Sequence, residues 1–145
     1  MKHFFLSLLL AITFGTTTFA ADDTMVSTNV LQSFQKTFSN AKEVNWSLTS
    51  EIYKADFVYN SQHVTAYYDA EGILLGLTKN ILSTQLPLLL ENSLKENYCG
   101  YWIADLVEFS SADGTFYYAT LENGDGKMVL KSNQNSWSVS KKIKK

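Results

Sequence analysis

The sequence predicts an α+β fold in which a unit of one helix followed by antiparallel strands occurs twice, with both helices packed on one face of the sheet. Three observations lead to this prediction. Two segments carry apolar residues at helical spacing, the segments after each of them alternate as strands do, and the second half repeats the pattern of the first at a fixed offset.

The two helices are predicted from spacing and from their end signals. The first begins near Asn29, where Ser27 or Asn29 can cap it, and its apolar side consists of Val30, Leu31, Phe34 and Phe38. The second opens at Pro87, a residue suited to a first helical turn, and Gly100 stops it. Its apolar side consists of Leu86, Leu90, Leu94 and Tyr98.

Six strands follow from alternation between turn signals. Residues 53–59 and 63–68 form a predicted hairpin that turns near Asn60-Ser61, and residues 73–78 form a third strand after a turn at 69–72. In the second half, residues 117–121, 128–132 and 137–142 are the predicted strands, with a turn at 123–126.

The sequences of the two halves can be aligned with each other directly. An offset of 64 matches Tyr53 to Tyr117 and Ala55 to Ala119, and upstream an offset of 63 places Trp46 on Phe109. The predicted repeats are residues 30–82 and 86–145. Trp46 and Trp102 are both expected in the core.

Since both helices cover one face of the sheet, its other face is expected to stay open. Alternation assigns an aromatic and charged set of side chains to that face, and this composition is typical of a protein-binding surface. The predicted protein-binding residues are Lys54, Asp56, Val58, His63, Thr65, Tyr67, Phe116, Tyr118, Lys127 and Val129. Structural cover of the sheet or a homodimer contact are the alternative roles of these rings.

The N-terminal pattern predicts export. Lys2 and His3 precede an apolar run over residues 4–14, and Thr18-Phe19-Ala20 supplies the small residues of a cleavage site, so residues 1–20 are predicted to be a signal peptide cleaved near Ala20. The run is shorter than the ~20 residues that cross a bilayer, so no transmembrane segment is expected. Residues 21–29 are predicted to be a flexible leader, and residues 30–145 the folded domain.

Charge and cysteine content limit the partners. The chain has 12 Lys and Arg against 14 acidic residues and a net charge of -2, and without Arg or a basic patch outside its C-terminal end it is a poor nucleic-acid binder. The single cysteine, Cys99, has no partner in the chain. It is expected to be a buried or half-buried inert thiol, or else to form an intermolecular disulfide.

Catalytic and metal-binding patterns are missing from the sequence. After removal of the signal peptide His63 is the only histidine, no nucleophile motif accompanies it, and a zinc site lacks ligands. The turns at 69–72 and 123–126 do not continue as calcium loops, and no glycine-rich phosphate loop is present. We therefore expect no enzyme, no cofactor and no metal.

Five segments together resemble the PepSY-like, β-lactamase-inhibitor-like family of exported bacterial proteins. They are residues 38–46 (FSNAKEVNW), residues 53–57 (YKADF), residues 67–72 (YYDAEG), Leu86-Pro87 and residues 114–119 (GTFYYA). The resemblance spans roughly residues 30–143 and implies a tandem helix-plus-sheet repeat, a periplasmic location and no enzymatic activity. It also implies a sheet surface presented to a protein partner, as in the namesake inhibitors.

The sequence thus predicts a non-enzymatic periplasmic module that binds or inhibits another exported protein through the open face of its sheet. The alternative is a small-ligand or cell-envelope binding protein with a pocket between the repeats.

Overall fold

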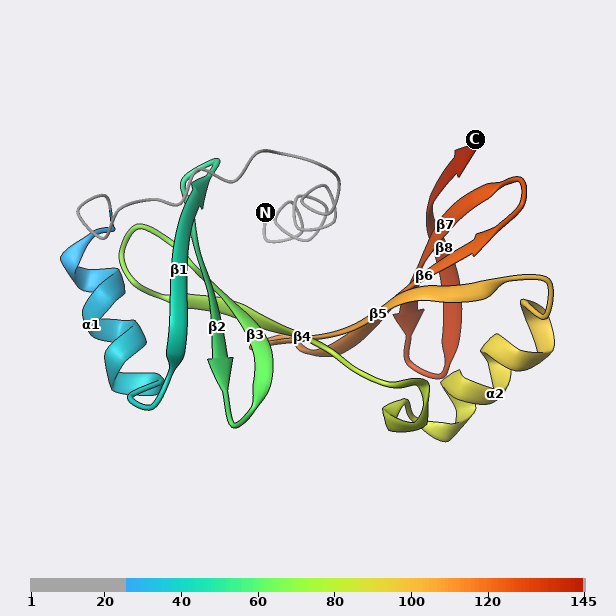
Figure 1. Ribbon diagram of the computed structural model, residues 1–145, viewed down its shortest axis with the longest axis horizontal. Coiled ribbons are helices and arrows are strands. Elements are labelled where there is room, and N and C mark those ends of the chain that lie inside the picture. The colour runs from blue at the N-terminus through green and yellow to red at the C-terminus, as the bar shows by residue number, and fades with distance from the viewer. Residues whose placement is uncertain (1–25, 145) are drawn as a thin grey trace.

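The computed structural model describes residues 26–144, and it contains one eight-stranded sheet and two α-helices (Figure 1). The first half consists of α1 (Thr28–Thr37), β1 (Lys42–Thr49), β2 (Ile52–Tyr59), β3 (Gln62–Tyr68) and β4 (Leu74–Asn80). After a short 3-10 helix (Ser83–Gln85), the second half consists of α2 (Leu88–Asn97), β5 (Trp102–Ser111), β6 (Gly114–Asn123), β7 (Gly126–Asn133) and β8 (Ser136–Lys144).

The strands follow one another in the sheet in chain order, β1 to β8, and every neighbouring pair is antiparallel. Figure 1 shows α1 and α2 at opposite ends of the molecule, with β4 and β5 joining the two halves. The predicted α+β class, with a helix and antiparallel strands in each half, is confirmed.

Both helices begin at the predicted N-terminal signals, whereas α2 ends at Asn97, three residues before the predicted stop at Gly100. In α1 the Ser27 hydroxyl accepts a hydrogen bond from the Val30 N–H at 3.4 Å, and Val30 and Phe34 are buried. Pro87 precedes α2, which buries Leu90 and Leu94 against the sheet. The buried residue Val26 packs in the first core, so the folded part begins before the boundary that the sequence predicted near residue 30.

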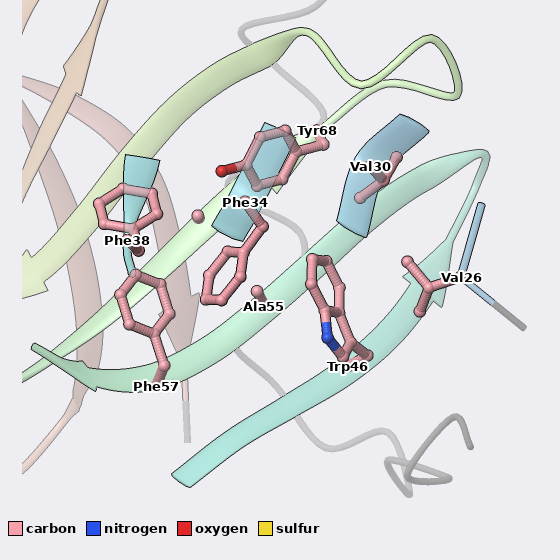
Figure 2. Close-up of a cluster of buried hydrophobic side chains, with 9 residues drawn as sticks. Val26, Val30, Phe34, Phe38, Trp46, Ala55, Phe57 and Tyr68 are labelled. Carbon is pink, nitrogen blue, oxygen red and sulfur yellow. The ribbon is translucent and has the colours of Figure 1, made fainter. Parts of the chain in front are cut away.

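Each helix covers its own hydrophobic core. In the first half, aromatic rings from α1 and the sheet meet edge to face: Phe34 lies 5.2 Å from Trp46 and 4.9 Å from Phe57, measured between ring centroids (Figure 2). The core of the second half is aliphatic, built mainly from Leu86, Leu94, Leu106, Leu121, Met128 and Leu130. The alternation of the predicted strands therefore assigned the helix-covered face correctly.

The register that relates the two halves differs from the predicted one. α2 begins 60 residues after α1, at Leu88 against Thr28, and Leu106 pairs with Ala119 as Trp46 pairs with Ala55. The equivalent of Trp46 is therefore Leu106, not Phe109, and the predicted offset of 63 is wrong. The offset is 60 from α1 to α2 and from β1 to β5, but 64 from β2 to β6 and from β3 to β7. The β5–β6 hairpin is therefore four residues longer than the β1–β2 hairpin.

The structure also adds strands β1 and β5, which the sequence analysis did not predict. The expectation that Trp102 lies in the core is wrong, since its side chain is 54% exposed. The register explains this exposure. Trp102 pairs with Glu122, and residues paired across an antiparallel sheet point to the same face, here the face away from the helices.

Candidate functional site: the open face of the sheet

We call the face of the sheet opposite the two helices the open face. Cross-strand pairing places all ten predicted binding residues on it, in two groups. On β2 and β3 the pairs are Lys54 with Tyr67, Asp56 with Thr65 and Val58 with His63. On β6 and β7, Phe116 and Tyr118 share the face with Lys127 and Val129.

The group on β2 and β3 is polar and satisfied within the fold. The Lys54 ammonium lies 2.9 Å from one carboxylate oxygen of Asp56, and the Thr65 hydroxyl donates to the other at 2.6 Å. His63, at the end of the strand, is exposed, and Val58 is half-buried. These charges already have partners in the free protein.

Two of the ten residues are less accessible than a contact surface requires. Tyr67 is 7% exposed and Val129 5% exposed. Burial raises the pKa of the Tyr67 hydroxyl, which is hydrogen-bonded to the side chain of Thr78 on β4. The expectation that Tyr67 and Val129 meet a partner directly is therefore corrected: they support the face from within.

The middle of the open face holds residues that the sequence analysis did not assign to it. Gly76 on β4 pairs with Tyr67, and Phe109 on β5 pairs with Phe116. Phe109 is 3% exposed, and its ring covers Gly76 so closely that a Cβ on that glycine would lie 2.5 Å from the ring. The glycine thus makes room for an aromatic side chain at the junction of the two halves.

The group on β6 and β7 combines aromatic rings with a cation. The Lys131 ammonium lies 4.7 Å from the centroid of the Phe116 ring and 5.8 Å from that of Tyr118. Burial lowers the pKa of Lys131 and raises that of Tyr118, because each charged form loses hydration. Lys127 is paired with Glu122 at 3.1 Å.

Trp102 extends the open face towards the other end of β6. Its ring is more than half exposed, and it stands on β5 opposite Glu122, four residues along β6 from Tyr118 and six from Phe116. Tryptophan is enriched among the residues that contribute most to protein interfaces. Sequence reasoning missed it because Trp102 follows a turn and its strand was not predicted.

The larger grooves among the described residues include one beside the helix of each half. The groove between α1 and β1 has a volume of about 530 Å³ and is lined by Leu31, Phe34, Gln35, Phe38, Ser39, Ala41, Val44 and Trp46. The other, of about 280 Å³, is lined by Leu94, Lys95, Tyr98, Cys99, Tyr101, Ile103 and Leu121. Each of these grooves belongs to a single half.

No group of three or more His, Cys, Asp or Glu that could hold a metal ion occurs in residues 26–144. Cys99 is exposed, so the expectation of a buried or half-buried thiol is wrong. No helix within the described range is long and apolar enough to cross a membrane. The predicted signal peptide lies outside the described residues.

An eight-stranded antiparallel sheet with a helix in each half is the fold of BLIP-like, that is β-lactamase-inhibitor-like, proteins. A BLIP-like protein from Bacteroides fragilis has a TM-score of 0.68 and 19% identity, over 81% of this chain and 85% of that chain.

Two further structures from this genus share the fold. A DUF2874 family protein from Bacteroides ovatus has a TM-score of 0.72 and 16% identity, over 90% of this chain and 89% of that chain. A protein from Bacteroides eggerthii inferred to be periplasmic has a TM-score of 0.74 and 12% identity, over 82% and 88%. At these identities the likeness shows the fold alone. No family model and no curated protein matches the sequence.

Proposed function

We propose that this chain is a non-enzymatic periplasmic module of the PepSY-like group that binds another exported protein on the open face of its sheet. The secretory pattern of residues 1–20 and the periplasmic assignment of the Bacteroides eggerthii neighbour support the location. The proposal does not include inhibition of a β-lactamase, since the likeness to a BLIP-like protein is one of fold.

The observation that carries the proposal is the placement of Trp102. Tryptophan is a costly residue to leave in water, and here more than half of the ring is exposed on the face that neither helix covers. Phe116 and Tyr118 lie half-buried on the same face, so a partner would gain apolar area without displacing any residue of the helix-covered cores.

The test is affinity capture by the exported protein, purified from the periplasm, with captured proteins quantified by mass spectrometry. Trp102→Ala should lose a specific partner, with Kd for the isolated complex rising by at least about thirtyfold if the tryptophan is an interface anchor. Leu88→Ala is the matched control, because Leu88 is 68% exposed on the helix side. Its affinity should stay within about twofold of the unsubstituted protein.

Both substitutions are at exposed positions, so the variants should fold, and circular dichroism verifies this. A partner that binds the Trp102→Ala variant as tightly as the original protein would overturn the proposal.

The alternative, a small-ligand or cell-envelope binding protein with a pocket between the repeats, makes a different prediction. A ligand that binds only the folded state raises the melting temperature with its concentration. The two grooves described above each lie within one half, at the helix and its following strand. A ligand-dependent rise that Trp102→Ala leaves unchanged would favour this alternative.

A further inference from the structure

Lys131 differs from the other lysines of the central strands in having no carboxylate beside it. Three of them are in ion pairs, Lys54–Asp56 at 2.9 Å, Lys79–Glu108 at 3.1 Å and Lys127–Glu122 at 3.1 Å. Lys131 forms no ion pair with any residue between 26 and 144, and its ammonium instead lies over the rings of Phe116 and Tyr118. The open face therefore contains a cation whose counter-charge does not come from the described fold.

The surroundings of Lys131 make an anion more favourable there than at an ordinary surface lysine. Its side chain is half-buried, and the lowered pKa reflects water lost from the ammonium. Contact with an aromatic face is weaker than pairing with a carboxylate, so it replaces only part of the lost hydration. A carboxylate that approached Lys131 would gain a charge-assisted hydrogen bond in a region already partly dehydrated.

The rings beside Lys131 indicate what kind of molecule carries that carboxylate. A free anion would use the charge of Lys131 but would leave the exposed parts of Phe116 and Tyr118 in water. A protein surface that presents an acidic side chain next to apolar residues would use both features. Aromatic side chains are enriched in the buried part of protein interfaces.

We propose that the partner binds the open face through an Asp or Glu side chain that pairs with Lys131, while apolar residues beside that carboxylate pack on Phe116 and Tyr118. This inference rests on the proposed function, since it names the chemistry of the partner for the same face. It adds that recognition is electrostatic as well as apolar, with the positive charge on this chain.

The experiment is a selection of disulfide-constrained random peptides, displayed on phage, on the immobilised exported protein. Enriched peptides should carry Asp or Glu adjacent to an aromatic or aliphatic residue. For synthetic versions, Lys131→Met should raise Kd at least about tenfold, and Lys131→Arg should keep it within about threefold. Lys36→Met removes the same charge from the exposed side of α1 and should change Kd less than twofold.

A second selection on the Lys131→Glu variant gives a result that a loss of stability would not mimic. The enriched peptides should then carry Lys or Arg at the position that was acidic. Binding should also weaken with salt for the original protein, as expected when a charge pair contributes to the affinity.

The experiments distinguish a failure of this inference from a failure of the proposed function. If the peptides lose binding to Trp102→Ala but show no acidic preference and bind Lys131→Met unchanged, the inference is wrong and the proposed function stands. If no peptide depends on Trp102 or on Lys131, both are wrong. Displacement of the peptides by 100 mM acetate would indicate a small-anion site, and a dimer that dissociates on Lys131→Met in sedimentation would indicate a second copy; either result overturns the inference.

Discussion

Replacement of Gly76 by alanine is the sharpest test of how the two halves are joined. A Cβ at this position would lie 2.5 Å and 2.6 Å from two ring carbons of Phe109 and 3.0 Å from the carbonyl oxygen of Ser110. Because Phe109 is only 3% exposed, its ring has little room to move. The backbone of Gly76 is not in the left-handed region, so alanine is disfavoured by packing and not by conformation.

Overpacking of this kind costs about 1–3 kcal/mol, while replacing a strand glycine by alanine returns about 0.5–1 kcal/mol of backbone entropy. We therefore expect Gly76→Ala to lower the free energy of unfolding by about 1–2 kcal/mol. For a domain of this size that corresponds to a fall in melting temperature of roughly 3–10 °C. Urea denaturation followed by circular dichroism measures the change, with the midpoint moving and the slope unchanged.

Two further variants decide whether Phe109 is the cause. Gly124→Ala is the control, since a Cβ there meets no atom within 4 Å, and it should be neutral within about 0.5 kcal/mol. In the double variant Gly76→Ala/Phe109→Leu the ring carbons are gone, so the two changes should be less destabilising together than their sum by about 1 kcal/mol. Additive effects, or a neutral Gly76→Ala, would refute the contact and with it the assignment of Phe109 to the open face.

Four other predictions follow from buried or exposed polar groups. The Tyr68 hydroxyl is buried without a hydrogen-bond partner in residues 26–144, so Tyr68→Phe should leave stability unchanged or raise it by up to about 2 kcal/mol in urea denaturation. Burial raises the pKa of Tyr68 to about 12. Between pH 10 and 12 the Tyr68 hydroxyl therefore stays protonated in the folded state, whereas it ionises in the unfolded state. The free energy of unfolding should fall over this range by at most about 1.4 kcal/mol per pH unit. The fall should be less steep in Tyr68→Phe. The exposed thiol of Cys99 should react with a maleimide in the native protein at a rate within about tenfold of that in urea, and a protected thiol would show that it is covered. Trp137 donates its indole N–H to the carbonyl of Leu90 at 2.9 Å, tying β8 to α2, so Trp137→Phe should cost about 1–2 kcal/mol in thermal unfolding.

The strands that the sequence revealed are those with a regular alternation of buried and exposed residues. β2 buries Ala55 and Phe57 in strict alternation, and its counterpart β6 buries Ala119 and Leu121 in the same way. β1 has a single buried residue, Trp46, because it is an edge strand with a register shift near its start. β5 has a register shift between residues 103 and 105, which moves the period-two pattern to the other face partway along the strand.

The sequence predicts on which face of the sheet the candidate residues lie, but not how deeply each of them is buried. Alternation fixes which face a side chain points to, and cross-strand pairing agrees for all ten predicted residues. How far a residue is buried depends on the size of its neighbours on adjacent strands, which sequence spacing does not give. Tyr67 lies beside Thr78 with the Phe109 ring over neighbouring Gly76, so it is covered, whereas Trp102 at the end of its strand is not.

One aromatic pair distinguishes the two halves of the open face. Phe109 and Phe116 pair at the position where Thr49 and Ile52 pair in the β1–β2 hairpin, and the Phe109 ring lies over Gly76 on β4. Lys54 in the first half is already neutralised by a carboxylate, so a partner would gain little there. In the second half a cation meets rings that are still partly in water, so we expect the binding free energy to come mainly from β5, β6 and β7.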